Sequence, residues 1–394
     1  MISFDEALRR VLEAAVPLGT QSVPLSEAEG RVVAGPVAAR LAMPRYDVSA
    51  MDGYAVREAD LGAVPFTLPV RGESAAGSPP GGELAPGTAI RIFTGAPVPA
   101  GADRVIVQEN VEREGDLARF VRPHGSARHI RAAGSDFREG EVLVPAGRTL
   151  DWRALTAAAA ADQALLTVYR RPRVAVLATG DELATPGQAR DIPGAIPESV
   201  SFGIAAFVRE AGGELVWRKR SPDDPRQLEI VAAEALSAAD LVIVIGGASV
   251  GDRDHSRSMF AGKPDYIFPK VAIKPGKPVW FARVGGRLVL GLPGNPTSAL
   301  VTARLFLAPL LAGLGGREAA AFVVFETWRL AAALPAAGDR ETFVRARVCG
   351  EGALPLVHQD SSSQANLLQA ELLLRQRQGA PELQAGDEVP ALRF

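Results

Sequence analysis

The sequence RVAVLATG, residues 173–180, decides the fold class, because it is a continuous apolar run that ends in glycine. ADLVIVIGG, residues 239–247, repeats this pattern. Such runs are typical of parallel strands that are buried on both faces. Helical spacing lies between them, over 198–213 and again over 225–238. Strands that alternate with helices predict a doubly wound α/β domain, which binds ligands beyond the carboxyl ends of its strands.

The segments on either side of this domain have a different pattern, and a chain of 394 residues is long enough for several domains. Short strands between Gly- and Pro-rich turns predict a β-rich lobe and, at the C-terminus, a small β-barrel. An Ala-rich helix that begins at Trp152 is expected to pack on a helix at 3–16. The predicted domains are an elongated N-terminal linker or dimerisation domain (1–45 and 137–170), an inserted β-rich lobe (46–136), the α/β domain (171–316) and the C-terminal β-barrel (317–394).

The composition excludes several classes of protein. Charged residues make up 22% and the net charge is −2, so the chain lacks the basic excess of a nucleic-acid binder. A single cysteine, Cys349, excludes internal disulfides and Cys-rich metal sites. The four histidines form no HExxH pair, so oxygen ligands and Mg²⁺ are expected for any metal. The N-terminus has no signal-peptide core, and Arg304 interrupts the best candidate for a membrane span. We therefore expect a cytoplasmic protein.

Three loops that leave the ends of predicted strands carry most of the candidate binding residues. They are TGDEL at 179–183, GGASVGDRD at 246–254 and GLPGNPTS at 291–298. Glycine lets backbone N–H groups approach an anionic or flat ligand, although glycine at such turns is often purely structural. The spacing matches neither a dinucleotide-binding GxGxxG nor a P-loop. The residues expected to bind the ligand are Gly180, Asp181, Gly246, Gly247, Ser249, Gly251, Pro293, Gly294, Asn295, Pro296 and Ser298.

Carboxylates gather in the same region of the chain. Glu182 and Asp254 lie in two of these loops, and Asp223 lies in a further loop before the second helix. Carboxylates that converge on a pocket hold Mg²⁺ or act as general acids and bases. The alternative is helix capping, which we weigh for Asp181 and Asp224.

Lysine is rare in this chain and clustered. Only five of the 43 basic residues are lysine, and four of these five fall within 263–277. Lys270 and Lys274 lie four residues apart in a predicted strand, so both should point to one face, and Lys277 follows a Pro-Gly turn. Three ammonium groups near glycine loops suggest phosphates or an oxyanion as substrate. Chance clustering at turns is the alternative.

Two residues of the lobe are weaker candidates. Asp52 lies in AMDGYAV at 50–56, and Thr94 begins TGAP at 94–97. Acids and hydroxyls at turns often make only local hydrogen bonds, and the residues alone favour that interpretation.

Six motifs, taken in order, resemble one known family. They are SAMDGYAV, RIFTGAPVPAGAD, RVAVLATGDEL, IGGASVGDRD, AIKPGKP and GLPGNPTSALV. The chain resembles the MoeA family and the homologous E domain of gephyrin over about residues 3–316, and more loosely beyond them through RETFVRARV and DSSSQANLL. The resemblance implies four subdomains, an elongated homodimer and a molybdopterin molybdenumtransferase. The implied reaction is Mg²⁺-assisted transfer of molybdate onto adenylylated molybdopterin with release of AMP.

The resemblance also implies roles for individual residues. Because the lobe lies far from the α/β loops along the chain, Asp52 and Thr94 are expected to complete the site across the dimer. The last domain is expected to reach an oxyanion through an arginine and a serine. The implied metal ligands are Glu182, Asp223 and Asp254. The implied catalytic residues are these three together with Asp52, Thr94, Lys270 and Lys274. The implied substrate-binding residues include Lys277, Arg345 and Ser362.

The resemblance leaves one departure and two alternatives. Where the family commonly has Asp-Ser/Thr-Asn before a helix, this chain has Pro197-Glu198-Ser199-Val200, so pterin binding is expected to differ at Val200. The choice between molybdate and tungstate stays open, as do partner enzymes that hand over the substrate. The alternatives are a molybdopterin adenylyltransferase, against which the lobe and the C-terminal barrel argue, and a non-catalytic molybdopterin-binding or scaffolding protein.

Overall fold

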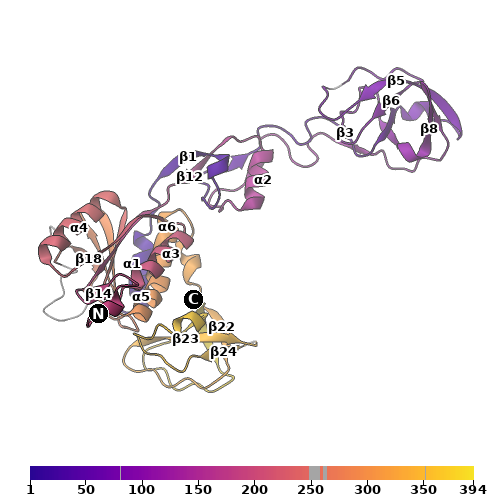
Figure 1. Cartoon of the computed structure of the whole chain (residues 1–394). Helices are drawn as coiled ribbons and strands as arrows, with labels where there is room; N and C mark the ends of the chain where they lie inside the picture. Colours follow the sequence, from indigo (N-terminus) through magenta and orange to yellow (C-terminus); the bar gives the residue numbers. More distant parts are fainter. Residues whose placement is uncertain (80, 248–257, 261–263, 351) are drawn as a thin grey trace.

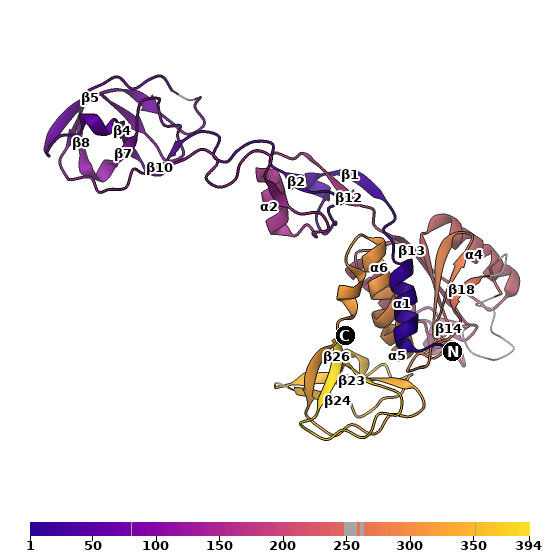
Figure 2. The ribbon, with the colours of Figure 1, turned by 180° about the vertical axis from the view of Figure 1, so that it is seen from behind.

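The computed structural model describes residues 1–394 except 80, 248–257, 261–263 and 351. Its ribbon has a body, a narrow arm and a lobe at the far end of the arm (Figure 1). The view from behind shows the same separation of lobe and body, with both chain ends in the body (Figure 2). The expected multidomain α/β architecture, with an inserted β-rich lobe and a C-terminal barrel, is confirmed. The individual domain boundaries stay a prediction.

A six-stranded sheet forms the centre of the body, with its strands in the order β16-β13-β17-β21-β20-β18. The first four strands are parallel, as predicted, whereas β20 and β18 pair antiparallel with their neighbours. Strand β18 was not expected from the sequence pattern. The bounds are β13 Arg173–Thr179, β16 Glu214–Ser221, β17 Leu241–Ile245, β18 Asp265–Phe268, β20 Trp280–Val284 and β21 Arg287–Leu292.

The side chains of the central strands alternate between two buried faces. On β13, Val176 packs in the core that contains α3 (Val200–Glu210), whereas Leu177 packs in the core that contains α4 (Pro225–Ala238). Every residue of β17 is buried as well. Helices therefore cover both faces of the sheet, and this explains why its strands are continuous apolar runs.

One helical stretch, Pro296–Leu314, is long and apolar enough to cross a membrane by length and composition. It consists of α5 (Pro296–Thr302), a π-helical turn (Ala303–Leu307) and α6 (Ala308–Leu314). Contrary to expectation, Arg304 does not interrupt this stretch. However, 89% of its apolar window is buried inside the protein, in the same core as α3, so the stretch is a core helix of the α/β domain.

The N-terminal helix α1 (Phe4–Ala14) packs in the core of the α/β domain, where Phe4 and Val11 are fully buried. The prediction that it packs on α2 (Trp152–Ala160) is wrong, because the buried side chains of α2 lie in a separate core in the arm. An amphipathic pattern shows that a helix buries one face, but not which partner covers that face.

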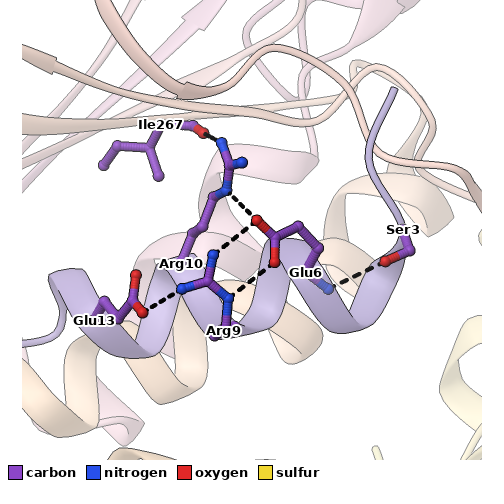
Figure 3. Close-up of polar contacts among 6 residues, drawn as sticks. All are labelled: Ser3, Glu6, Arg9, Arg10, Glu13 and Ile267. Carbon is purple, nitrogen blue, oxygen red and sulfur yellow. Dashed lines mark hydrogen bonds and ion pairs between the residues drawn. The ribbon is translucent and has the colours of Figure 1, made fainter.

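Polar contacts fix the start of α1 and attach it to the sheet (Figure 3). The Oγ of Ser3 accepts from the backbone N–H of Glu6 at 3.2 Å and caps the helix. The carboxylate of Glu6 accepts hydrogen bonds from Arg9 and Arg10, and these bonds lower the pKa of Glu6 to about 2. Arg10 also donates to the carbonyl oxygen of Ile267 on β18 at 2.6 Å, so one side chain joins helix and sheet.

The arm consists of two passes of the chain that pair in short antiparallel ladders. These are β1 (Thr20–Pro24) with β12 (Leu165–Tyr169) and β2 (Val37–Ala38) with β11 (Val142–Val144). A third ladder, β3 (Val48–Ser49) with β10 (Ile130–Arg131), packs on the lobe. The lobe is a six-stranded sheet in the order β7-β4-β6-β5-β9-β8. Its strands are β4 Gly53–Val56, β5 Phe66–Ser74, β6 Ala89–Ile92, β7 Arg104–Val107, β8 Val111–Glu114 and β9 Leu117–Phe120.

Five strands close the C-terminal barrel, because β23 pairs with both β24 and β25. The barrel joins the α/β domain through β19 (Ile273–Lys274), which pairs parallel with β23. The barrel strands are β22 Glu326–Leu330, β23 Glu341–Cys349, β24 Gly352–Pro355, β25 Leu372–Gln376 and β26 Glu388–Arg393. Short 3-10 turns cover Leu25–Glu27, Glu58–Asp60, Gln108–Asn110, Ala189–Asp191, Ala319–Val323 and Leu367–Gln369.

A glycine-to-alanine pair tests the packing of the sheet. A Cβ on Gly291 would lie 1.9 Å from Nε1 of the fully buried Trp280 on the next strand, so Gly291→Ala should lower the free energy of unfolding by about 1–3 kcal/mol. Gly203→Ala, in α3, meets only Leu300 at an ordinary 3.5 Å and should be neutral or stabilise by up to about 1 kcal/mol. Urea unfolding followed by tryptophan fluorescence compares the two variants, and equal midpoints would contradict the packing described.

Candidate functional site

A pocket of about 510 Å³ lies beyond the carboxyl ends of β13, β17 and β21. It brings together ten of the predicted site residues, which come from three strand-end loops, the loop before α4 and the C-terminal barrel. These residues are Gly180, Glu182, Asp223, Gly246, Gly247, Pro293, Gly294, Asn295, Pro296 and Ser362. Ser249, Gly251 and Asp254 lie outside the described residues. The predicted residues that do not line this pocket are Asp52, Thr94, Asp181, Lys270, Lys274, Lys277, Ser298 and Arg345.

Glycine backbone forms the floor of the pocket. Gly246 has a φ of +91°, and a Cβ there would lie 2.6 Å from the carbonyl oxygen of Thr179. A Cβ on Gly180 would lie 2.7 Å from Oε2 of Glu182, so any larger residue would displace that carboxylate. A Cβ on Gly294 would lie 3.4 Å from the Cα of Gly246. The strand ends are therefore in close backbone contact, and a ligand can approach the main chain directly.

One wall of the pocket holds Glu182 in place through the main chain. Strand β14 (Leu183–Ala184) pairs parallel with β15 (Ile196–Pro197). The N–H of Ile196 donates to the carbonyl oxygen of Glu182 at 2.8 Å, and the N–H of Glu198 donates to that of Ala184, also at 2.8 Å. The predicted catalytic acid is thus fixed at its backbone, beside the glycine floor.

Glu198 is a pocket residue that the sequence analysis did not single out. Its carboxylate is buried, lines the pocket and accepts from the N–H of Ser201 at 2.8 Å, from Ser201 Oγ at 2.5 Å and from Arg218 Nη1 at 3.2 Å. Glu198 precedes Ser199, the N-cap residue of α3, and accepts from a backbone N–H in the first turn of this helix. The sequence signal was an acid just before a helical pattern. Val200, the predicted departure, is buried in the core and presents an apolar side chain to the same pocket.

The neighbouring acids have different tasks. Asp224 is the N-cap of α4, because its carboxylate accepts from the N–H of Gln227 at 2.8 Å, so the capping alternative holds for this residue. Asp181 caps no helix; its Oδ1 accepts from the N–H of Asp223 at 3.0 Å and ties two of the loops together. Glu182 and Asp223 are the carboxylates of the predicted metal set that line the pocket.

The fit of this pocket to a metal ion can be judged from its donors. Within the part of the chain that the structure describes, no group of three His, Cys, Asp or Glu residues could hold a metal ion. The predicted third ligand, Asp254, lies outside that part. Two carboxylates on one pocket are nevertheless a suitable donor set for Mg²⁺, which in proteins often takes one or two carboxylates together with water and phosphate oxygens. The metal assignment stays a prediction.

The lysines do not share one strand face, and this prediction was wrong. Strand β19 comprises only Ile273–Lys274, so Lys270 lies before it and Lys277 lies in the turn after it. Lys274 is exposed and lines a second cavity of about 430 Å³ between β19 and the barrel. The predicted strand is too long at its start, because the backbone of Lys270 and Ala272 bonds to Ile2 and β19 begins only at Ile273.

Arg345 lines this second cavity together with Lys274. Its side chain is only 2% exposed, and burial lowers its pKa. Its Nη2 donates to the carbonyl oxygens of Asp360 at 3.2 Å and His358 at 3.4 Å. Arg345 therefore supports the segment that carries Ser362 to the first pocket. Its predicted contact with an oxyanion stays a prediction.

The two lobe residues form one unit. The backbone N–H and the Oγ1 of Thr94 both donate to Oδ1 of Asp52, at 2.7 and 2.8 Å. The bond from the backbone N–H is the main cause that lowers the pKa of Asp52, and the hydroxyl adds to it. Asp52 directly precedes β4 and Thr94 follows β6, and within one chain the arm separates the lobe that contains these strands from the body (Figures 1 and 2).

The carboxylate of Asp52 provides a pH test. Because folding lowers its pKa, the ionised group stabilises the fold above its ordinary pKa of 3.8, and this contribution is lost as the pH falls through the folded value. Thr94→Val removes the hydroxyl but keeps the backbone donor, so the pKa of Asp52 should rise part of the way towards 3.8. Thr88→Val, whose Oγ1 donates to the carbonyl oxygen of Ala85, is the control. NMR titration of the Asp52 carboxyl measures both, and an unchanged pKa in Thr94→Val would contradict the assignment.

Three family models match consecutive parts of the chain. The MoeA N-terminal region (domain I and II) matches residues 2–161, a probable molybdopterin binding domain matches 175–313, and the MoeA C-terminal region (domain IV) matches 327–394. Together the three models follow the order expected from the motifs.

Relatives and solved structures agree with these matches. A molybdopterin molybdenumtransferase from Nostoc sp. is 37% identical over 82% of this chain and 76% of its own length. Molybdopterin molybdenumtransferase 2 from Mycobacterium tuberculosis is 39% identical over 79% of each chain. A crystal structure of a molybdopterin biosynthesis MoeA protein from Pyrococcus horikoshii has a TM-score of 0.86 at 30% identity and covers 100% of this chain and 99% of that one. The chain therefore belongs to the MoeA family.

Proposed function

We propose that this protein transfers molybdate onto adenylylated molybdopterin and releases AMP, a step in molybdenum cofactor biosynthesis. The observation that supports this most is the pocket in which Glu182 and Asp223 border a floor of glycine backbone. A flat ring or a phosphate can lie directly against such a floor, and an acidic edge suits a metal-bound phosphate. The relatives that bear the name molybdopterin molybdenumtransferase support the same function.

The carboxylates of the pocket would hold Mg²⁺, with Asp254 as the third predicted ligand. When bound, the metal supplies Lewis-acid stabilisation of charge on the phosphate oxygens. The protein's own part is to keep Glu182 in position, through β14–β15 pairing and the glycine floor, and to keep Asp223 in position through Asp181. The positive side chains would hold the oxyanion and offset its charge: Lys270, Lys274, Lys277 and Arg345.

We also propose that two chains share each site. The pair formed by Asp52 and Thr94 lies at the far end of the arm, so a homodimer in which the lobe of one protomer meets the pocket of its partner would complete the site. The cytoplasm is the proposed location, and other enzymes of cofactor assembly are the proposed source of the substrate. The lobe and the barrel, which match the N- and C-terminal MoeA regions, favour this function over an adenylyltransferase or a scaffold.

An AMP-release assay tests the proposed reaction. Purified protein with adenylylated molybdopterin, Mg²⁺ and molybdate should release AMP. Glu182→Gln keeps the size of the side chain but removes its charge, and should slow release at least about tenfold, since even groups that only support a metal ligand contribute about 10–100-fold. Glu210→Gln, an exposed glutamate at the far end of α3, is the matched control. Release at the wild-type rate in Glu182→Gln would rule out the assigned role.

Mixed protomers test the shared site. Asp52→Ala and Glu182→Ala homodimers should each be inactive. In the mixed dimer, one of the two sites combines an intact lobe with an intact pocket, so about half of the wild-type activity should return. If mixing restores none, while size-exclusion chromatography shows that mixed dimers have formed, the shared site is wrong.

A further inference from the structure

A segment of the barrel forms part of the wall of the α/β pocket. We call residues 357–368 the serine strap; it follows β24 and the buried Leu356 and contains Ser362 and Gln364, both of which line the pocket. The exposed fractions of Val357 and Leu368, near the two ends, are 91% and 95%, and none of residues 357–368, all of them described, is buried. Apolar burial therefore does not hold the strap in place, so its position depends on hydrogen bonds.

The barrel holds the first part of the strap. The N–H of Leu356 donates to the carbonyl oxygen of Arg345 at 2.9 Å, and Gln359 Nε2 donates to the same oxygen at 2.8 Å. The guanidinium of Arg345 donates to the carbonyl oxygen of Asp360 at 3.2 Å. These bonds end at residue 360, before the strap reaches the pocket.

The start of helix α5 holds the second part. The N–H of Thr297 donates to the carbonyl oxygen of Ser361 at 3.2 Å, and Asn295 Nδ2 donates to Ser361 Oγ at 3.1 Å. The Oγ1 of Thr297 donates to the carbonyl oxygen of Ser363 at 2.7 Å, the shortest of the three bonds. Thr297 itself is fully buried, so its hydroxyl is a fixed point on a rigid element. Its bond is the one that lies between the two pocket-lining residues of the strap.

We propose that Thr297 is a positioning residue, whose hydroxyl fastens the serine strap to α5 and so keeps Ser362 and Gln364 at the pocket when substrate binds. The role in substrate binding rests on the proposed function, whereas the attachment itself does not. Loss of the hydroxyl returns the Ser363 carbonyl oxygen to water at little cost, so it should loosen the strap without unfolding the protein. A net hydrogen-bond contribution of the usual size corresponds to roughly a threefold to tenfold change.

Three variants of the full-length protein test this proposal. Thr297→Val removes the hydroxyl at nearly constant volume, and Thr297→Ser keeps it. Thr302→Val is the matched control, because this buried hydroxyl donates only to Ser298 and Ala299 within the same helical stretch. Hydrogen exchange reports on the strap through the N–H groups of Ser362, bonded to Asp360 Oδ1, and Leu367, bonded to the Gln364 carbonyl oxygen.

In Thr297→Val we expect the hydrogen-exchange rates of these strap amides to rise about threefold to tenfold. The KM for adenylylated molybdopterin should rise by a similar factor, while kcat changes less. Thr297→Ser should behave like the wild type, and Thr302→Val should leave strap exchange unchanged. Unchanged strap exchange in Thr297→Val overturns the attachment. Faster exchange with an unchanged KM overturns its role in substrate binding. If the wild type releases no AMP at all, the proposed function fails, and the exchange data still decide whether Thr297 holds the strap.

Discussion

Close backbone contact between the carboxyl ends of β13, β17 and β21 is the constraint on which the rest of the site depends. Gly246 lies against the carbonyl oxygen of Thr179, at a distance that leaves no room for a side chain, and a Cβ on Gly294 would be in van der Waals contact with the Cα of Gly246. The contact is possible because helices cover both faces of the sheet and keep its parallel strands in register. It creates a floor of main chain with carboxylates at its edge, which is a surface for an anionic, flat ligand.

The molecule divides the remaining tasks among its parts. The α/β domain supplies the floor and the acids, and the barrel adds one wall through the serine strap. The arm and lobe carry Asp52 and Thr94 away from the pocket of their own chain. Arg345 has a supporting place in this arrangement, because its guanidinium is buried and donates to the strap carbonyls. Arg345 therefore lines the second cavity and, through these bonds, also supports the strap that lines the first pocket.

Local patterns in the sequence predicted the strands and helices whose residues and neighbours along the chain determine their form. The strands β13 and β17 were evident because both faces are buried, and the helix α4 was evident from its proline start and the capping Asp224. Contacts between distant segments were not predictable. The packing partner predicted for α1 was wrong, the strand predicted to contain Lys270 begins only at Ile273, and the bond from Thr297 to Ser363 joins residues 66 positions apart. The motifs identified the pocket acids, whereas Glu198 was missed because its role comes from burial beside Arg218.

The central claim is that the glycine floor and its two carboxylates form the place where the adenylylated substrate binds. A crystal structure with AMP and Mg²⁺ tests this most directly. The account predicts that the phosphate of AMP lies against the main chain of Gly180 and Gly246, with Glu182 and Asp223 beside the metal. Ordered AMP in the cavity next to Arg345, or on any other surface with the pocket empty, would contradict it.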